Sequence, residues 1–344
     1  MEEPRGAYKT KVHDVCRDAA CAAASLEVPR LPRNRVHSRR MAASSVEDSR
    51  AAASRLFRID RCDWSPSIPP AGVADDVIQA LESGNVLFLP SLRFALHADE
   101  ASLLTPAILG RAKNASFDPA TGRLGGTSVS GAQAAALQAM MQRFSDAALA
   151  LVTALCPGYG PRLGRRRASF RPAEIAGRTT TWRKDDTRLH VDSFPATPSG
   201  GQRILRLFTN VNAEGRPRSC RIGGEFEEVA RRFAPQLRLP LPGSRQLLRL
   251  LGLTKTTRTR YDAVMLQLHD RMKGDADFQA HAPQTAVDFP AGSTWVAFTD
   301  QVNHAAMAGQ YQLEQTFLLP IDAMAAPERS PLRVLERIMN TRLV

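Results

Sequence analysis

Apolar residues recur along this chain at helical spacing in some segments and in short compact runs in others. The longest periodic segment, Gly131 to Cys156, carries an apolar residue every three or four positions and ends at a Pro-Gly pair, which predicts one long scaffold helix. A shorter helix is expected over Asp75 to Glu82. Arg245 to Asp270 has an apolar face, and Ser330-Pro331 supplies a cap residue followed by proline, so each is predicted to form or begin a helix.

Compact or alternating apolar runs bounded by proline and glycine predict the strands. The predicted strands are Asn85 to Pro90, Ala168 to Ile175, Thr179 to Trp182, Arg188 to Phe194, Arg203 to Asn212, Thr294 to Thr299 and Leu313 to Leu319. Helices therefore come first, and a set of strands interrupted by a helical segment follows. This order predicts the α+β class, with a double-stranded β-helix (jelly-roll) core buttressed by helices.

The composition changes near residue 55. Residues 1–55 are rich in Ala, Arg and Ser, and Tyr8 is their one aromatic residue. Because a basic segment of this kind lacks apolar periodicity, we expect a disordered N-terminal extension. The functional alternative is a basic arm that contacts a membrane or a nucleic acid. Residues 56–344 are expected to form a single oxygenase domain, on the chemistry below, with a helical insertion at about residues 225–285.

Charge and cysteine content indicate the cellular compartment and the kind of partner. The five cysteines contain no CxxC pair, which is typical of a reduced, cytoplasmic protein. No apolar run reaches the roughly 20 residues needed to cross a bilayer, so no transmembrane segment is expected. The net charge of +12 favours a polyanionic partner, which leaves nucleic acid, an anionic membrane face and an acidic substrate as candidates.

The candidate chemistry lies in two short stretches. The triplet His190-Val191-Asp192 falls on a predicted strand, where residues two apart project to the same face. His304 follows a glycine turn and the predicted strand Thr294 to Thr299. Two imidazoles and one carboxylate form the facial triad of non-haem iron(II) oxygenases. Such a centre keeps three coordination positions open, two for a keto-acid cosubstrate and one for dioxygen.

A keto-acid cosubstrate also needs a cation for its distal carboxylate. Arg206 lies in the interior of an otherwise apolar predicted strand, and a buried arginine requires an anionic partner. Arg171 is a second candidate by the same reasoning. A structural ion pair with a protein carboxylate is the alternative for both. Basic residues are dense just before the HxD triplet, and Arg183, Lys184 and Arg188 are candidate substrate contacts by proximity alone.

These stretches resemble the bacterial Kdo 3-hydroxylases, which act on the eight-carbon acidic sugar that joins lipid A to the core of lipopolysaccharide. The resemblance runs from about Asp63 to the C-terminus. It rests on Thr181 to Asp192 (TWRKDDTRLHVD), Asn210-Val-Asn212, Phe298 to Gly309 (FTDQVNHAAMAG), Asp118 to Gly122 (DPATG) and Ser330 to Arg333 (SPLR). One departure from many related oxygenases is the last predicted strand, which has no Arg or Lys after the distal histidine. That departure favours Arg206 as the carboxylate anchor.

The resemblance implies an Fe(II)-, 2-oxoglutarate- and dioxygen-dependent hydroxylation at C3 of the Kdo sugar of Kdo-lipid A, which gives Ko. It implies that His190, Asp192 and His304 are the iron ligands, that Arg206 holds the cosubstrate and that Arg171 helps it. We expect a cytoplasmic enzyme, with peripheral attachment to the inner face of the bacterial inner membrane as an option.

Three other interpretations of the sequence stay open at this stage. The first is an oxygenase of the same type that acts on another acidic sugar, a protein or a small molecule. The second is a non-catalytic jelly-roll lectin for acidic sugars. The third is a nucleic-acid-binding protein, although no helix-turn-helix, zinc-finger or RNA-recognition motif accompanies the charge.

Overall fold

The structure is a computed structural model that describes residues 55–69 and 71–344. The expected disordered extension therefore lies, apart from residue 55, outside the described residues. The described part forms eleven strands, listed in chain order: β1 (Leu56–Arg58), β2 (Val86–Leu89), β3 (Ala115–Asp118), β4 (Arg123–Gly125), β5 (Gly164–Arg171), β6 (Arg203–Asn210), β7 (Arg218–Gly223), β8 (Gln284–Phe289), β9 (Thr294–Phe298), β10 (His304–Ala308) and β11 (Gln312–Leu319).

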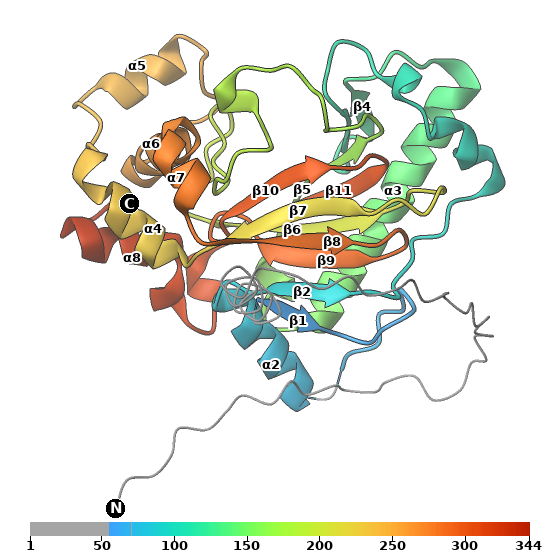
Figure 1. Ribbon diagram of the computed structural model, residues 1–344, viewed down its shortest axis with the longest axis horizontal. Coiled ribbons are helices and arrows are strands. Elements are labelled where there is room, and N and C mark those ends of the chain that lie inside the picture. The colour runs from blue at the N-terminus through green and yellow to red at the C-terminus, as the bar shows by residue number, and fades with distance from the viewer. Residues whose placement is uncertain (1–54, 70) are drawn as a thin grey trace, which may run out of the picture.

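The α-helices of the described residues are α2 (Ala71–Glu82), α3 (Gly131–Leu155), α4 (Phe226–Phe233), α5 (Ser244–Leu250), α6 (Arg260–Gly274), α7 (Ala276–His281) and α8 (Pro331–Met339). Four of them, α4 to α7, lie between β7 and β8 in the chain and gather with α8 at one end of the molecule (Figure 1). None of the helices in the described ranges is long and apolar enough to cross a membrane.

Two sheets face each other and enclose the site. The larger has eight strands in the order β1-β2-β9-β6-β11-β5-β3-β4, and the smaller has the order β10-β7-β8. Their pairings are antiparallel except that of β1 with β2. Figure 1 shows the smaller sheet lying across the larger one, with α3 behind. The predicted α+β class and jelly-roll core are confirmed.

The outer face of the large sheet packs against α2 and α3 and forms the main core. Side chains alternate along β6: Leu205 and Leu207 are buried in this core, whereas Arg206 and Phe208 point to the space between the sheets and line the pocket there. An arginine in an otherwise apolar strand is thus explained by the period-2 geometry of the strand. The second core, between the insertion helices and α8, includes Leu189 and Val191.

Three predicted elements were wrong. Thr179 to Trp182 and Arg188 to Phe194 are not strands; that region is irregular, with one short 3-10 helix over Trp182–Lys184 and a single β-bridge at His190. Local side-chain hydrogen bonds, such as those from the backbone and hydroxyl of Thr187 to Asp185, compete with a strand ladder there.

The predicted helix Arg245 to Asp270 is two helices, α5 and α6. Gly252, with a φ of 69°, interrupts it just after α5. Thr259 and Asp262 then form a capping box that starts α6, because each side chain accepts a hydrogen bond from the other residue's backbone N–H.

Other strands were missed or displaced. β7 and β8 were not predicted, because their polar residues conceal the alternation. β10 begins at His304 itself, so this histidine opens a strand instead of following one. β5 begins four residues before the predicted strand and includes the run Arg165-Arg-Arg167. A strand so rich in arginine does not have the apolar pattern on which the prediction relied.

Candidate metal centre

Backbone hydrogen bonds bring the HxD triplet beside the start of β10. The N–H of His190 donates to the carbonyl of His304 over 3.0 Å, and the N–H of His304 donates back over 2.9 Å. The N–H of Asp192 donates to the carbonyl of Thr299 over 2.8 Å. Leu189 and Val191 point the other way, into the second core. The alternation expected of a strand therefore holds, although the triplet lies in an extended segment with one bridge.

Both histidine rings are oriented by their own backbone. The Nδ1 atom of His190 lies 2.7 Å from the carbonyl oxygen of Arg188, and that of His304 lies 2.7 Å from the carbonyl oxygen of Val302. A carbonyl accepts only, so Nδ1 carries the proton in each ring. Nε2 of each ring is then left with a free lone pair, which is the form that binds a metal.

The electrostatics of the cluster favour the same form. Burial, followed by the nearby His304 and Lys273, lowers the pKa of His190 well below the ordinary histidine value, so its imidazole is neutral. Burial acts to raise the pKa of Asp192, but Arg206 and the two imidazoles outweigh it and hold that pKa below the ordinary aspartate value. The cluster thus offers a neutral imidazole from His190 and an ionised carboxylate from Asp192.

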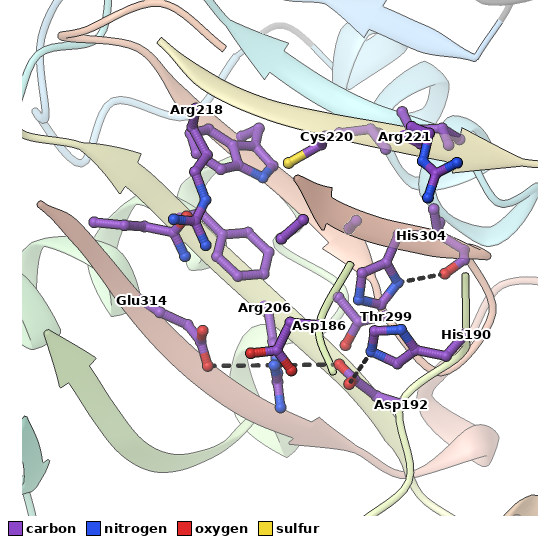
Figure 2. A pocket seen from close by; sticks show the side chains of 18 of the residues that line it. Asp186, His190, Asp192, Arg206, Arg218, Cys220, Arg221, Thr299, His304 and Glu314 are labelled. Carbon is purple, nitrogen blue, oxygen red and sulfur yellow. Dashed lines mark hydrogen bonds and ion pairs between the residues drawn. The ribbon is translucent and has the colours of Figure 1, made fainter. Parts of the chain in front are cut away.

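The three side chains fit a metal ion. One ligand atom from each of His190, Asp192 and His304 lies within 4.8 Å of the other two. The distance from His190 Nε2 to the nearer Asp192 oxygen is 3.9 Å. The other oxygen of Asp192 is buried and lies 3.2 Å from Arg206 Nη1. Figure 2 shows the three side chains converging on one side of the pocket. The set suits a divalent transition metal with open positions.

The pocket in front of this cluster has a volume of about 340 Å³, which is enough for a small organic acid. Its floor comes from β6, β9 and β11, its opposite wall from β7 and β10, and part of its rim from α6. Phe208, Phe289 and Trp295 form an apolar stack at one end, with Trp295 stacked on both of the others at ring-centroid distances of 5.4 and 4.1 Å.

Arg206 and Arg171 both line this pocket, and both contact protein carboxylates. Arg206 Nη1 lies 3.2 Å from Asp192 and 3.4 Å from Glu314. Arg171 Nη2 lies 2.9 Å from the other oxygen of Glu314, and its Nη1 lies 4.0 Å from Asp186. Each guanidinium therefore has a protein partner, yet the Nε atom of each is buried without an acceptor among the described residues.

Sequence reasoning missed a third arginine, Arg218 at the start of β7. It is 2% exposed, lines the same pocket and donates from Nη1 to the carbonyl of Gly309 over 2.7 Å. Its Nε is also buried without an acceptor. The charges of Glu174 and Asp186 act on Arg218, but none of the described carboxylates forms a direct ion pair with it. Burial lowers its pKa to about 10. Because β7 was not predicted as a strand, nothing in the sequence placed this residue inside the barrel.

The rim contains two further residues that sequence reasoning passed over. His269 lines the pocket, and its ring meets that of His190 edge-on at a centroid distance of 5.4 Å. Lys273, one helical turn later on α6, also lines the pocket, and burial lowers its pKa. Their spacing of four residues on one helix face was the available signal.

The three substrate contacts inferred from proximity lie in different places. Arg183 lines the pocket, stacks over the Trp182 ring at 4.0 Å and contacts Asp270 through Nε at 3.0 Å. Lys184 and Arg188 are not among the lining residues. Arg188 instead donates to the carbonyl of Lys273 over 2.8 Å and so joins the triplet segment to α6.

A buried support lies behind the distal histidine. Arg203 and Asp300, each 1% exposed, form an ion pair with an Nε–Oδ2 distance of 2.8 Å, and Arg203 Nη2 donates to Gln301 over 2.6 Å. These contacts fix the turn that leads from β9 to His304. In the same turn, the side chain of Asn303 packs closely against Gly223. A Cβ atom placed on Gly223 would lie 2.2 Å from the amide nitrogen of Asn303.

Comparison with known proteins identifies the family to which this fold and site belong. The family model for 3-deoxy-D-manno-oct-2-ulosonic acid (Kdo) hydroxylase matches residues 64–342. A crystal structure of the Kdo hydroxylase KdoO, a non-haem Fe(II) alpha-ketoglutarate-dependent dioxygenase, in complex with alpha-ketoglutarate and Fe(III), has 46% sequence identity to this chain. It superposes with a TM-score of 0.81, and the match covers 84% of this chain and 97% of that one.

The cobalt(II) complex of the same hydroxylase and its apo form each match with a TM-score of 0.82, at the same identity and coverage. A sequence search of curated proteins gave no significant match. The family match spans most of the chain and agrees with the resemblance found in its motifs. The chain belongs to the Kdo hydroxylase family.

Proposed function

We propose that this protein is an Fe(II)/2-oxoglutarate-dependent hydroxylase that converts the Kdo sugar of Kdo-lipid A to Ko by hydroxylation at C3. The observation that carries the proposal is one pocket that combines the cluster of His190, Asp192 and His304 with three arginines whose buried Nε–H groups lack acceptors. When bound, ferrous iron supplies dioxygen activation coupled to oxidative decarboxylation of 2-oxoglutarate. The chain's own residues bind and orient the two organic reactants.

His190, Asp192 and His304 would hold the iron. Their Nδ1–H bonds to backbone carbonyls keep both imidazoles in the tautomer that presents Nε2, so no proton has to move when metal binds. Arg206 keeps Asp192 ionised and lies beside it. We expect His190→Ala and Asp192→Ala to abolish both Co(II) binding, followed by its visible absorption, and succinate production. Unchanged binding in either variant would refute the ligand assignment.

Three arginines would receive the cosubstrate. A dicarboxylate that chelates the metal through one end leaves its distal carboxylate inside the barrel, where donors from Arg206, Arg171 and Arg218 line the wall. Arg206 and Arg171 already form ion pairs with protein carboxylates, whereas Arg218 is buried with no direct ion pair among the described residues and has Glu174 and Asp186 only as more distant charges. A buried cation needs an anionic partner, and a bound 2-oxoglutarate would supply it. Arg218 therefore joins Arg206 as an anchor, with Arg171 as helper.

Two variants separate these roles. Arg218→Gln should raise the KM for 2-oxoglutarate by on the order of 100-fold, because a hydrogen-bonded charge pair is lost, while Co(II) affinity at pH 7 stays unchanged. Arg206→Gln should raise that KM and also weaken Co(II) binding, since Asp192 loses the cation that keeps it ionised. An unaltered KM in both would show that another group holds the cosubstrate.

The rim and the overall charge suit an acidic, membrane-borne acceptor. Arg183, Arg221 and Lys273 line the pocket. The sugar carboxylate and the lipid A phosphates would oppose them, and the net charge of +12 matches an anionic bilayer surface. We therefore propose that the enzyme acts in the cytoplasm at the inner face of the inner membrane, on lipid-linked Kdo.

One experiment tests the proposal. The protein, ferrous iron, 2-oxoglutarate and Kdo-lipid A are incubated together, and the lipid is analysed by mass spectrometry for a gain of one oxygen atom, with fragmentation to place it at C3. Free Kdo and lipid A without Kdo serve as parallel acceptors. Hydroxylation of free Kdo alone would refute the lipid-linked substrate, and binding without succinate formation would indicate a lectin.

A further inference from the structure

Most of the large apolar side chains that are exposed in the described part of the chain belong to one segment. Among the described residues eight large hydrophobic side chains are exposed, and six of them are leucines between residues 239 and 253. We call these six the leucine surface: Leu239, Leu241, Leu247, Leu250, Leu251 and Leu253. Leu250 is 83% exposed and Leu241 is 78% exposed. An apolar cluster of this size on the outside of a folded chain marks an interaction surface.

The leucine surface lies on and around α5, which projects from the insertion at the upper left of Figure 1, away from both sheets. Arg245 and Arg249 alternate with the leucines on this helix. They donate to the carbonyl of Arg258 and the hydroxyl of Thr257, at 3.2 and 3.4 Å, which holds the helix against the following loop. The insertion thus presents leucines and arginines together.

The charge around the surface identifies the partner. From residue 238 to residue 260 the chain has six Arg or Lys residues and no Asp or Glu. Two copies of such a segment would repel each other, which disfavours a dimer through this surface. An anionic lipid bilayer accepts both features, because leucines enter the acyl boundary while arginine stems extend to the phosphates.

The same segment is tied to the pocket. Arg258 donates to the carbonyl of Pro195 over 2.7 Å, and the N–H of Lys255 donates to the carbonyl of Ala196 over 3.0 Å. Phe194 and Pro195 line the pocket. Docking of the leucine surface would therefore hold the pocket rim near the headgroup layer, where a lipid-linked acidic sugar projects.

We propose that the leucine surface is a membrane-docking site for an anionic phospholipid bilayer. The docking itself is independent of catalysis. Only its consequence, delivery of a lipid-linked sugar to the pocket, rests on the proposed function. The exposed leucines supply insertion, and the arginines and the lysine between residues 238 and 260 supply selectivity for anionic headgroups. The insertion between β7 and β8 then serves both as a rim of the pocket and as the attachment of the enzyme to its substrate-bearing surface.

The test is cosedimentation of the full chain with phosphatidylcholine vesicles, with and without phosphatidylglycerol. The variant Leu241→Ser/Leu250→Ser should lower the partition coefficient by at least about tenfold, because each leucine loses its insertion. The matched control, Ile68→Ser/Val344→Ser, removes two exposed apolar side chains elsewhere and should bind like the wild type. Arg249→Gln should lower the partition coefficient about fivefold, whereas Arg111→Gln, at an exposed arginine outside this segment, should leave it unchanged.

Several results would overturn the proposal. One is no binding of wild type to anionic vesicles, and another is equal binding by the leucine variant and its control. Equal binding to vesicles without phosphatidylglycerol would refute the charge selectivity. A wild-type dimer that the leucine variant abolishes, with no vesicle binding, would make the surface an interface between copies. Because the assay contains no substrate, its failure is distinguishable from a failure of the proposed hydroxylation.

Discussion

The contact between Gly223 and Asn303 allows a sharp test of how the distal histidine is held. Gly223 ends β7, and its N–H donates to the carbonyl of Asn303 over 2.7 Å. A Cβ at this position would lie 2.2 Å from the side-chain nitrogen of Asn303 and 2.7 Å from its Cγ, where ordinary contacts begin at 3.4 Å. Gly223→Ala therefore requires the new Cβ and the Asn303 side chain to move apart by about 1.2 Å, the difference between 3.4 Å and 2.2 Å.

Asn303 has little room to yield. Its side chain is fully buried, and it immediately precedes His304, whose backbone pairs with His190. We expect the overpacking in Gly223→Ala to cost about 1–3 kcal/mol of unfolding free energy. The displacement should also move His304, and an error near 1 Å in a catalytic group costs on the order of 100-fold in rate.

The assay combines thermal denaturation with Co(II) titration and succinate formation. Gly224→Ala is the matched control, because a Cβ there meets only Glu228 Oε2 at 3.5 Å, an ordinary contact. The control should behave like the wild type, whereas Gly223→Ala should melt several degrees lower and bind Co(II) at least about tenfold more weakly. If both alanine variants match the wild type in melting temperature and Co(II) affinity, the steric argument is wrong.

Three further predictions follow from buried or half-buried side chains. Arg203→Met should lower the free energy of unfolding by about 3–5 kcal/mol, as thermal denaturation would measure, because it leaves Asp300 buried and unpaired. The double variant with Asp300→Leu should recover part of that loss. An Arg203→Met variant as stable as the wild type would contradict this reasoning. Burial acts to raise the pKa of Glu174, but backbone N–H donors that include Gly309 outweigh it and lower that pKa below 4.5. The stability that ionised Glu174 contributes is therefore present above pH 4.5 and is lost as the pH falls through the lower pKa of the folded state. The difference in melting temperature between the wild type and Glu174→Gln should accordingly close in acid; a difference that persists there would contradict the argument. Burial raises the pKa of Cys220 to about 11 from 9.0, so iodoacetamide at pH 8 should label it about a hundredfold more slowly than an ordinary thiol, as peptide mass spectrometry would measure.

Elements with strong apolar periodicity were predictable from the sequence. The helix predicted over Gly131 to Cys156 is α3, and β6, β9 and β11 occupy the expected places, because each buries an apolar face in the main core. Six strands were missed. Three of them, β1, β3 and β4, are runs of three or four residues at or near the edges of the large sheet, too short to show a period. The other three, β7, β8 and β10, form the small sheet, whose inner face lines a polar pocket. Residues selected for binding do not repeat the apolar pattern that reveals a strand.

The site was partly predictable. The triplet His190 to Asp192 and His304 meet as expected, since an extended segment projects alternate side chains to one face and a turn returns the chain beside it. The predicted strand around the triplet does not exist, yet two bridging hydrogen bonds produce the same alternation. Arg218 escaped notice because its burial depends on β7, which only tertiary pairing with β8 and β10 reveals.

Each histidine ring of the cluster is held by a carbonyl two residues before it in its own chain segment. Their tautomers are thus set by backbone carbonyls within short local stretches. The side-chain hydrogen bonds that reach the backbone of the triplet segment at Leu189 from the insertion come from Gln279 on α7 and not from α6. An engineer could therefore exchange the rim contributed by α6, and with it the acceptor that the pocket admits, while both imidazoles stay aimed at the same point. Separate control of metal geometry and acceptor choice is a property that a designed oxygenase needs.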